Sequence, residues 1–557
     1  MATERRSKYV ADFETTTDPN DCRVWGYGIM NVFNHKSYMI GNDMDSFMQI
    51  LERLKCDVYF HNLRFDGSFI INWLYRNGFE YSDTPRAFTF NTTISKMGQW
   101  YKIQIVYDTD SRGRPIHTTI FDSLKKLPFT VKRIAETFKL KSLKGEIDYT
   151  KYRPPNHEIT LYERKYIYND IYIMAQALRI QFGNGLLNMT IGSDALKDYK
   201  KIINSRTFDN LFPVLSDYVD NDIRRSYKGG FTWLNKKYQN KEIDGGLVFD
   251  VNSLYPYVMY DRELPYDVPI YFEGEYEHDP YYPLYIQHIK CEFEIKPDKI
   301  PTIQIKQNMY FNSNEYLEHS NNIEVDLYLT NVDLELMKEH YDFKYIIYMS
   351  GWKFKSQQGF FNDYIEKWSK VKENSVGGER ELAKLMLNNL YGKFATNPDI
   401  TPKIPRFDGK KIKLVLGDED KKDPVYTAMG SFITSYARDY TIRTAQKNYE
   451  RIIYCDTDSI HLEGVDIPEN IIEIIDSKKL GFWDHEATFK RGKYLRQKTY
   501  IHEFDDGVKV TCAGMPDNIK DKVTFDTFKV GFSSDGLLTP KQVPGGVVLF
   551  DSVYTIH

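Results

Sequence analysis

The 557-residue sequence lacks several features that would assign it to a familiar class of protein. No apolar run is long enough to span a bilayer, and no apolar stretch follows the N-terminal residues, so membrane and secreted proteins are not predicted. The five cysteines lie far apart and form no Cys-x-x-Cys pair, so neither a zinc site nor a disulfide framework is predicted. Repeats, low-complexity tracts and a Walker nucleotide-binding sequence are also missing. We therefore expect a cytoplasmic protein with free thiols.

The sequence also has no excess of positive charge. Its net charge is −4, which taken alone argues against a polyanionic partner. Net charge averages over surfaces, however, and a nucleic-acid enzyme that binds metal ions needs acidic clusters as well as basic tracks. Aromatic residues are abundant, with 43 Tyr and 34 Phe, and they suit either stacked bases or ordinary packing. The length predicts about four domains, which must abut closely because no linker separates them.

The pattern of apolar residues indicates a mixed α/β chain. An acidic stretch over 261–280 predicts a solvated insertion. Glycines 377 and 378 are expected to separate two helices, and glycines 545 and 546 to form the turn of a C-terminal hairpin. The other predicted elements are strands at 9–13, 58–60, 247–249 and 452–454, and helices at 67–75, 161–182, 360–394 and 428–449.

Two acidic residues alternate on the first predicted strand. Asp12 and Glu14 lie two residues apart, so both carboxylates point to one side of the strand. Carboxylates this close repel each other, and a divalent cation relieves the repulsion. Asp66 follows the strand at 58–60, where a helix begins. Solvated carboxylates or ion-pair partners are the alternative interpretation.

A helix starting near residue 161 contributes a fourth acid. Thr160 and Glu163 have the spacing of a capping box. Tyr166 and Asp170 lie one helical turn apart, so both side chains can reach the same site.

The order of these motifs resembles the three exonuclease motifs of the DnaQ-like (RNase H-like) proofreading domain. This resemblance implies 3′-5′ hydrolysis of single-stranded DNA with two metal ions, with Tyr166 orienting the attacking water. The ligands would be Asp12, Glu14, Asp66 and Asp170. Further implied residues are the catalytic Lys144 and the DNA contacts His61, Asn62, Phe65, Phe69, Ser123 and Leu124. A turn serine and a solvated lysine are the alternatives at positions 123 and 144.

A second set of acids lies in the other half of the chain. Asp250 ends the apolar strand at 247–249, and Asp456 and Asp458 lie between two apolar runs, at the tip of a predicted hairpin. Such a tip is a candidate metal site or an ordinary Asp-rich turn. Between these segments, Lys384, Asn388 and Tyr391 share one helix face, which can bind a triphosphate, a sugar edge and a base.

A basic segment follows at 489–500. It carries five Lys or Arg and no acid, interleaved with Phe489, Tyr494 and Tyr500. Cations and aromatic rings in this arrangement fit a nucleic-acid backbone, although a solvated strand is the alternative.

The motifs Asp-x-x-Ser-Leu-Tyr-Pro, Lys-x-x-x-Asn-x-x-Tyr-Gly and Tyr-x-Asp-Thr-Asp-Ser resemble motifs A, B and C of the family B DNA polymerases, and Lys498-Thr499-Tyr500 resembles their Lys-x-Tyr motif. The sequence is similar over nearly its whole length to the protein-primed branch of that family, which replicates linear phage genomes. The segments that carry this similarity are 12–17, 227–234, 331–340, 382–394 and 494–500.

The resemblance implies a multidomain fold, α/β in the exonuclease domain and α+β in a right-hand polymerase. The implied domains are the exonuclease (1–190), palm (191–261 and 427–512), fingers (360–396), thumb (513–557) and two insertions, at 262–359 and 397–426. In this branch the first insertion contacts a terminal protein that primes synthesis, and the second promotes strand displacement and processivity. Implied partners are primer-template DNA, single-stranded DNA, deoxynucleotides and the terminal protein, with two Mg²⁺ ions per site (Mn²⁺ as the alternative), in a monomer located in the cytoplasm of the infected bacterium.

The resemblance also assigns roles by residue. The metal ligands of the polymerase site would be Asp250, Val251, Asp456 and Asp458, of which the three aspartates are catalytic. The nucleotide contacts would be Tyr255, Lys372, Arg380, Lys384, Asn388 and Tyr391, with Tyr255 excluding a ribose 2′-hydroxyl. The DNA contacts would be Tyr227, Gly229, Gly230, Ser253, Thr434, Arg438, Arg496, Lys498 and Tyr500.

The sequence departs from the family pattern at two places, and two alternative functions stay open. Arg380 replaces a more usual Lys, and the segment 533–536 lacks a basic cluster, which predicts a weaker, more salt-sensitive grip on duplex DNA. The alternatives are a 3′-5′ exonuclease whose second half only binds DNA, and a replication scaffold without catalysis.

Overall fold

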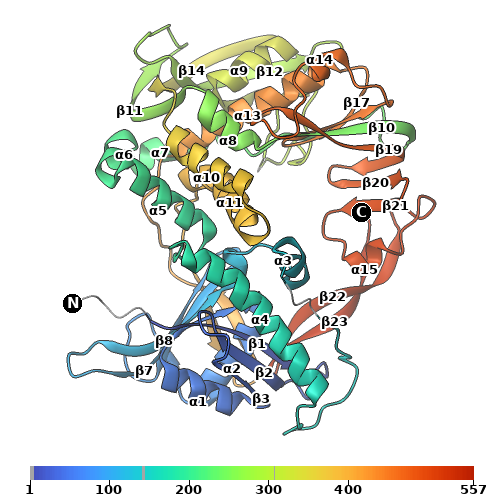
Figure 1. The fold of residues 1–557 in the computed structure, drawn as a ribbon. Helices are drawn as coiled ribbons and strands as arrows, with labels where there is room; N and C mark the ends of the chain where they lie inside the picture. Colours follow the sequence, from blue (N-terminus) through green and yellow to red (C-terminus); the bar gives the residue numbers. More distant parts are fainter. Residues whose placement is uncertain (1–5, 141–144, 307) are drawn as a thin grey trace.

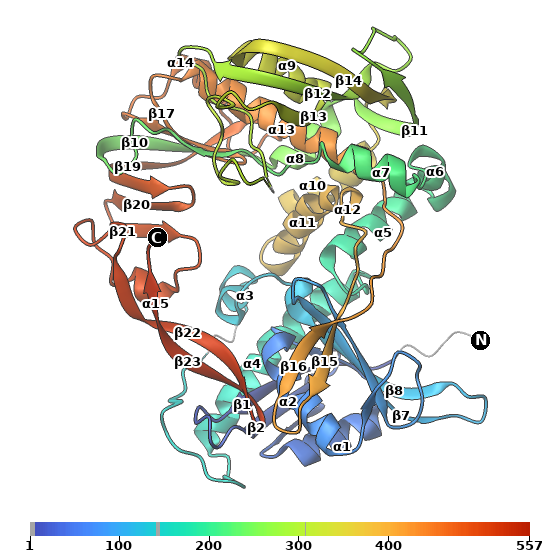
Figure 2. The ribbon, with the colours of Figure 1, turned by 180° about the vertical axis from the view of Figure 1, so that it is seen from behind.

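The computed structural model describes residues 6–140, 145–306 and 308–557, so Lys144 lies outside the described residues. Its N-terminal part forms the lower half of the molecule in Figure 1, and most of the remaining chain forms the upper half. Helices α4 and α5 connect the halves on one side, and the C-terminal hairpin reaches back to the lower half on the other, as the reverse view in Figure 2 also shows.

The lower half is built on an eight-stranded sheet of order β3-β2-β1-β4-β8-β7-β6-β5. The capping box predicted for α4 is present, because the Thr160 side chain accepts from the backbone of Glu163 while Glu163 accepts from the backbone of Thr160. Helix α4 packs on β1, and its apolar residues such as Ile171 share one core with Val10 of that strand, which brings the two predicted acidic motifs together. The strands are β1 (Lys8–Thr15), β2 (Val24–Asn31), β3 (Tyr38–Gly41), β4 (Asp57–Phe60), β5 (Glu80–Tyr81), β6 (Thr89–Ile94), β7 (Trp100–Thr109) and β8 (Pro115–Asp122). The helices are α1 (Met44–Leu54), α2 (Leu63–Arg76), η1 (Ser123–Lys125), α3 (Val131–Thr137) and α4 (Leu161–Gly183).

The upper half contains a seven-stranded sheet of order β21-β20-β19-β10-β18-β17-β9. The long helix α13 packs beside it and lines much of the main apolar core. The strands are β9 (Thr232–Leu234), β10 (Glu242–Val251), β17 (Ile452–Asp456), β18 (Ser459–Glu463), β19 (Trp483–Arg496), β20 (Thr499–Phe504) and β21 (Gly507–Cys512). The helices in this part of the chain are α5 (Ile191–Ile203), α6 (Ser205–Leu211), α7 (Asp217–Arg224), α8 (Leu254–Asp261), α13 (Thr427–Lys447), α14 (Glu469–Ile472) and α15 (Asp517–Lys520).

A four-stranded sheet of order β11-β14-β12-β13 lies at the top of the upper half in Figure 1, on the side away from the lower half. Its first strand, β11 (Leu264–Glu273), lies in the acidic stretch that was predicted to be only a solvated insertion. The charge pattern missed this strand because its pairing partner, β14 (Tyr341–Gln357), lies far away in the sequence. The other elements are β12 (Leu284–Ile295), β13 (Val325–Thr330) and α9 (Asn331–His340).

Three smaller elements project from this framework. The predicted helix pair is confirmed as α10 (Asn362–Asn374) and α11 (Gly378–Asn389), followed by α12 (Tyr391–Phe394). The hairpin of β15 (Lys403–Phe407) and β16 (Ile412–Leu416) packs on α2, where the Tyr75 hydroxyl donates to the Pro405 carbonyl at 2.7 Å. The predicted C-terminal hairpin is confirmed as β22 (Ser533–Val543) and β23 (Gly546–Thr555). It also contacts α2, because Gln542 Nε2 donates to Ser68 Oγ at 2.8 Å.

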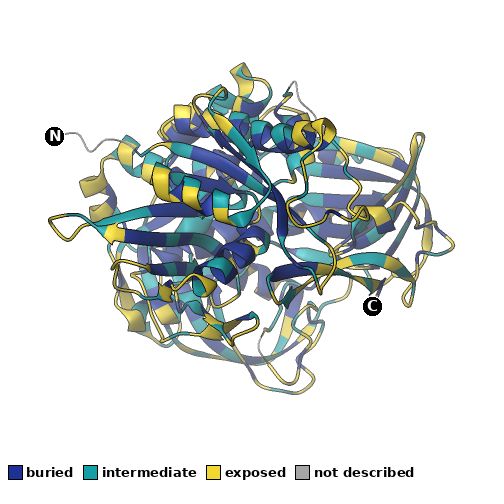
Figure 3. Cartoon of the chain, turned by 90° about the horizontal axis from the view of Figure 1, so that it is seen from below, coloured by how far each residue is buried: buried dark blue, intermediate teal, exposed yellow. Residues whose placement is uncertain are grey.

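Many buried residues lie in the strands of the sheets, which are largely dark blue in Figure 3. Exposed residues lie mainly on loops and on the outer faces of helices. All five cysteines are free thiols, as predicted, and all five are buried. In the part of the chain that the structure describes, no helix is both long and apolar enough to cross a membrane.

Candidate active sites

Three of the predicted exonuclease acids converge at one point. Asp12 and Glu14 on β1 and Asp170 on α4 offer carboxylate oxygens that all lie within 4.8 Å of one another. Glu14 and Asp170 are both only 3% exposed. Buried carboxylates at this distance fit divalent cations with oxygen ligands. Asp66 on α2 lies beside them: burial, followed by the negative charge of Asp12, raises its pKa well above the usual range.

Tyr149 completes this cluster and was not predicted. Its hydroxyl donates to Glu14 Oε2 at 3.1 Å and lies 3.3 Å from the Tyr166 hydroxyl. Tyr149 is 44% exposed, but its hydroxyl lies against Glu14 and Tyr166. The loss of water around the hydroxyl, followed by the charge of Glu14, raises its pKa, so it stays protonated and remains a donor. Tyr149 lies in an irregular segment, where no periodicity or spacing in the sequence connects it to the acids.

Four of the predicted contacts for single-stranded DNA gather around Asp122. His61 Nδ1 is 3.0 Å from Ser123 Oγ, and the backbone N–H groups of Asn62 and Leu124 both donate to Asp122, at 3.1 and 3.0 Å. Asp122, which the sequence analysis missed, therefore fixes two of the predicted segments relative to each other.

Phe65 and Phe69 follow on α2, with ring centroids 5.8 Å apart. Phe65 is partly exposed, whereas Phe69 is 3% exposed and lies under Gly546 of the C-terminal hairpin. The DNA contacts predicted for these rings stay predictions, and a contact at Phe69 requires this hairpin to shift.

The second acidic set lies on the central strands of the seven-stranded sheet. Asp250 on β10 is directly opposite Ser459 of β18 on one side and Asp484 of β19 on the other. Burial, followed by the negative charges of Asp458, Glu486 and Asp484, raises the pKa of Asp250 to about 8. Burial also raises the pKa of Asp458, to about 6. Asp484 and Glu486 were not predicted, because neither belongs to a motif that the sequence analysis used.

Asp456 lies in a different environment. Its carboxylate accepts from Lys498 Nζ at 2.9 and 3.0 Å, from the Tyr454 hydroxyl at 3.1 Å and from the Thr232 hydroxyl at 3.0 Å. Among the described residues, the only trio of Asp, Glu, His or Cys with ligand atoms within 4.8 Å is the Asp12 cluster, so the carboxylates of the second set lie less tightly together. Val251, the remaining predicted ligand, donates its backbone N–H to the Asp458 carbonyl at 2.7 Å.

Two predicted nucleotide contacts stack on each other near Asp458. The rings of Tyr255 on α8 and Tyr391 on α12 have centroids 4.0 Å apart and planes 20° apart. Asn388 lies one turn before Tyr391 and is exposed. The helix face that was predicted to bind the nucleotide, on α11 and α12, is thus partly covered by Tyr255 of α8.

The predicted cations gather on α10 and α11. Lys372 Nζ donates to Ser253 Oγ at 3.3 Å, and Arg380 donates to the Lys372 carbonyl at 2.8 Å. Burial, then the charges of Arg380 and Lys384, lowers the pKa of Lys372. Lys384 forms an ion pair of 2.7 Å with Glu381. Three cations concentrated in this way favour a polyanionic ligand such as a triphosphate.

Comparison with known proteins decides the family. Residues 48–477 match the model of DNA polymerase type B, organellar and viral. The chain belongs to this family of DNA polymerases. It is 56% identical to the DNA polymerase of Bacillus phage M2, over 99% of this chain and 100% of that protein. It is 33% identical to the DNA polymerase of Streptococcus phage Cp-1, over 99% of this chain and 98% of that protein.

Solved structures agree with this assignment. Phi29 DNA polymerase in complex with primer-template DNA and incoming nucleotides is 55% identical and superimposes with a TM-score of 0.95, covering 99% of this chain and all of that one. The same polymerase bound to single-stranded DNA also gives a TM-score of 0.95. Polymerases of this family use divalent metal ions, which the cluster of Asp12, Glu14 and Asp170 fits.

The loop at 227–230 lies against Thr457, in the turn between Asp456 and Asp458. A Cβ atom on Gly230 would lie 2.4 Å from Thr457 Oγ1, so only glycine allows this approach. Arg438, 3% exposed, donates to the carbonyls of Lys228 and Gly229 at 2.9 and 2.8 Å and pairs with Asp333 at 2.6 Å.

Tyr227 is partly exposed beside this loop, whereas Thr434, 1% exposed, donates to the Gly430 carbonyl within α13. The DNA contacts predicted for Arg438 and Thr434 stay predictions, and in this structure both side chains bind protein groups.

The basic segment at 489–500 exposes fewer of its side chains for contact with DNA than its sequence suggested. Phe489 and Tyr494, which alternate with the basic residues in the sequence, are both fully buried, so neither ring is exposed to stack on a base in this structure. Apolar neighbours in the sheet enclose these rings, which a strand's own sequence does not reveal. Arg496 and Lys498 are exposed and Tyr500 is partly exposed, as a DNA track requires.

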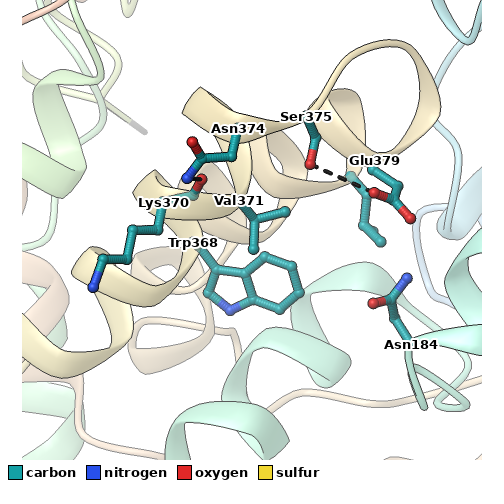
Figure 4. Close-up of a pocket in the computed structure, with 8 residues that line it drawn as sticks. Asn184, Trp368, Lys370, Val371, Asn374, Ser375 and Glu379 are labelled. Carbon is teal, nitrogen blue, oxygen red and sulfur yellow. Dashed lines mark hydrogen bonds between the residues drawn. The ribbon is translucent and has the colours of Figure 1, made fainter.

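A separate pocket lies where α10 and α11 meet the end of α4 (Figure 4). Its volume is about 330 Å³, and Trp368 and Val371 point into it while Ser375 donates to Glu379 at 3.5 Å on its rim. No predicted site residue lines it. Beside it, Gly378 packs so closely on Phe138 that a Cβ atom would lie 2.6 Å from that ring.

Proposed function

We propose that the protein replicates a linear phage genome by protein-primed DNA synthesis and proofreads with a 3′-5′ exonuclease. The observation that carries this proposal is the presence of two separate carboxylate sets. Asp12 and Glu14 on β1 lie with Asp170 of α4, and Asp250 on β10 lies near Asp458 in the turn between β17 and β18. A binding protein gains nothing from two clusters of repelling acids.

In the polymerase site, Asp250 and Asp458 would bind Mg²⁺, with Asp456 and the carbonyl of Val251 beside them. Bound Mg²⁺ lowers the pKa of a primer 3′-hydroxyl and neutralises the leaving pyrophosphate. Lys372, Arg380 and Lys384 would hold the triphosphate, and Tyr255 and Tyr391 would pack against the sugar and the base pair. Lys498 and Tyr500 would contact the primer end.

In the exonuclease site, Asp12, Glu14, Asp66 and Asp170 would bind two Mg²⁺ ions. Bound cations activate a water and stabilise the charge on the transferring phosphate. Tyr166 would orient that water, and the hydroxyl of Tyr149 would hold Tyr166 and Glu14 in place. His61, Asn62, Phe65 and Ser123 would bind the single-stranded 3′ end.

The partners follow from family resemblance and from the relatives. The proposed insertion at 262–359 would contact a terminal protein, and the one at 397–426 would separate the strands ahead of synthesis. The relatives are phage enzymes, so we place this activity in the cytoplasm of an infected bacterium. The proposed domain boundaries are those given by the sequence analysis, with a palm, fingers and thumb after the exonuclease domain.

The test is a gel assay with a 5′-labelled primer on a longer template and Mg²⁺, with and without deoxynucleotides. We expect growth with nucleotides and shortening without them. Asp250→Ala is expected to abolish growth and keep shortening, and Asp12→Ala to do the reverse. Shortening by the wild type under both conditions would instead support the alternative, a nuclease whose second half only binds DNA. Replacing Mg²⁺ with Mn²⁺, and the primer with the terminal protein of the same phage, tests the metal and the priming mode.

A further inference from the structure

The loop that carries Tyr149 has no regular structure of its own. Residues 145–160 connect α3 to α4 without a helix or a strand. The Tyr149 hydroxyl nevertheless reaches both Glu14 and Tyr166. A segment without backbone pairing needs side-chain contacts to hold it in one conformation.

Arg153 supplies these contacts from within the loop. The residue is 4% exposed, and its Nη1 donates to the carbonyls of Asp148 and Lys151, both at 3.0 Å. These two carbonyls lie on either side of Tyr149 in the sequence. The guanidinium therefore fixes the backbone that positions Tyr149.

Glu163 anchors this guanidinium to the first turn of α4. Its Oε1 accepts from Arg153 Nε at 2.7 Å, and its Oε2 lies 2.8 Å from His157 Nε2 and 3.0 Å from the Thr160 hydroxyl. Burial would raise the pKa of Glu163, but the hydrogen bonds from His157, Arg153 and Thr160 outweigh it and lower the pKa to about 2. The carboxylate is therefore charged at neutral pH, and charge-assisted hydrogen bonds of this kind are strong.

Trp25 connects the same guanidinium to the strand that carries the catalytic acids. The guanidinium carbon of Arg153 lies 4.2 Å from the centroid of the Trp25 ring. The indole N–H of Trp25 donates to the Thr15 carbonyl at 3.1 Å, and Thr15 directly follows Glu14 in β1. Arg153 thus bridges the loop, α4 and the end of β1.

We propose that Arg153 is a positioning residue for the exonuclease reaction, which it serves by holding the loop so that the Tyr149 hydroxyl stays between Glu14 and Tyr166. This inference rests on the proposed exonuclease function. Arg153 touches no reacting atom in this account, and Glu163 acts only by fixing Arg153.

The test measures degradation of a 5′-labelled single-stranded oligonucleotide with Mg²⁺, together with primer extension by the same preparations. Arg153→Ala and Arg153→Lys are expected to lower kcat for degradation about 10- to 100-fold, as substitutions behind a metal site do, with little change in KM. Extension is expected to stay at the wild-type rate. The control is Arg164→Ala, which removes an exposed arginine next to Glu163 and is expected to leave both activities unchanged.

A double mutant separates positioning from a general loss of stability. If Arg153 acts through Tyr149, then Arg153→Lys in a Tyr149→Phe background lowers degradation no further than Tyr149→Phe does alone. The proposal would be overturned if the effects of Arg153→Lys and Tyr149→Phe on degradation multiply in the double mutant. It would also be overturned if both Arg153 variants degrade DNA at the wild-type rate. If Arg153→Ala unfolds and therefore also loses extension, the proposal is tested by comparing Arg153→Lys, Tyr149→Phe and their double mutant. A wild type that extends primers but never degrades DNA would overturn the exonuclease function itself.

Discussion

The rings of Tyr255 and Tyr391 stack on each other with centroids 4.0 Å apart, although 136 positions separate them in the sequence. Tyr391 therefore packs against one face of the Tyr255 ring and limits its movement. A ring fixed in this way can exclude a ribose 2′-hydroxyl by its bulk alone.

We expect Tyr255→Val to raise the ratio of ribonucleotide to deoxyribonucleotide incorporation about 10- to 100-fold, because a fixed pocket wall is removed. Tyr255→Phe keeps the ring and serves as the control, with the wild-type ratio expected. Single-nucleotide extension with each nucleotide measures both. Equal ratios for Tyr255→Val and the wild type would contradict this prediction.

The raised pKa of Asp250 predicts a pH-dependent metal requirement for polymerisation. At about 8, this pKa means that most Asp250 carries a proton at pH 7, and a metal ion must displace it. Raising the pH therefore strengthens metal binding, and we expect the Mg²⁺ concentration for half-maximal extension to fall about fivefold between pH 7 and pH 8.

Asp484→Asn provides a matched variant for this measurement. It removes one of the negative charges that raise the pKa of Asp250, so the same fall in the Mg²⁺ requirement is expected at lower pH. A Mg²⁺ requirement that is flat across this range in the wild type would show that Asp250 is not the group that limits metal binding.

The C-terminal hairpin docks through a glycine that no other residue can replace. Gly545 has a φ of 98°, and a Cβ atom there would lie 2.2 Å from the Cys22 carbonyl oxygen. We expect Gly545→Ala to separate the hairpin from α2 and to shorten the products made in one binding event, measured with a heparin trap. Gly514→Ala has a similar φ of 80° but open space around it, so it controls for backbone strain and should keep long products.

The hairpin of β15 and β16 docks on α2 through an aromatic pair. The rings of Tyr75 and Phe407 lie 5.6 Å apart, with planes 13° apart. Such pairs contribute about 0.5–1.5 kcal/mol, so we expect Phe407→Ala to slow synthesis through duplex DNA about 2- to 12-fold. Extension on a single-stranded template should stay unchanged.

Phe33→Ala is the control for this prediction, because it removes an exposed ring that contacts Phe182. An equal slowing on both templates by Phe407→Ala would mean that the hairpin supports the fold and not strand separation.

Local rules explain what could be predicted. The capping box at Thr160, the alternation of Asp12 and Glu14 and the hairpin turn at Gly545 all depend on residues a few positions apart, and all are present in the structure. Strand β11 was missed because its hydrogen bonds come from a distant partner, β14.

By itself, the sequence determined the two carboxylate sets, the order of the main elements and the family resemblance, because spacing along one strand or helix turn fixes which side chains share a face. Only the tertiary structure decided how loops and surfaces meet. Tyr149 lies 135 positions from Glu14, and Arg438 lies 105 from Asp333. Contacts of this kind depend on how whole sheets and helices pack, and no local pattern of residues encodes that packing.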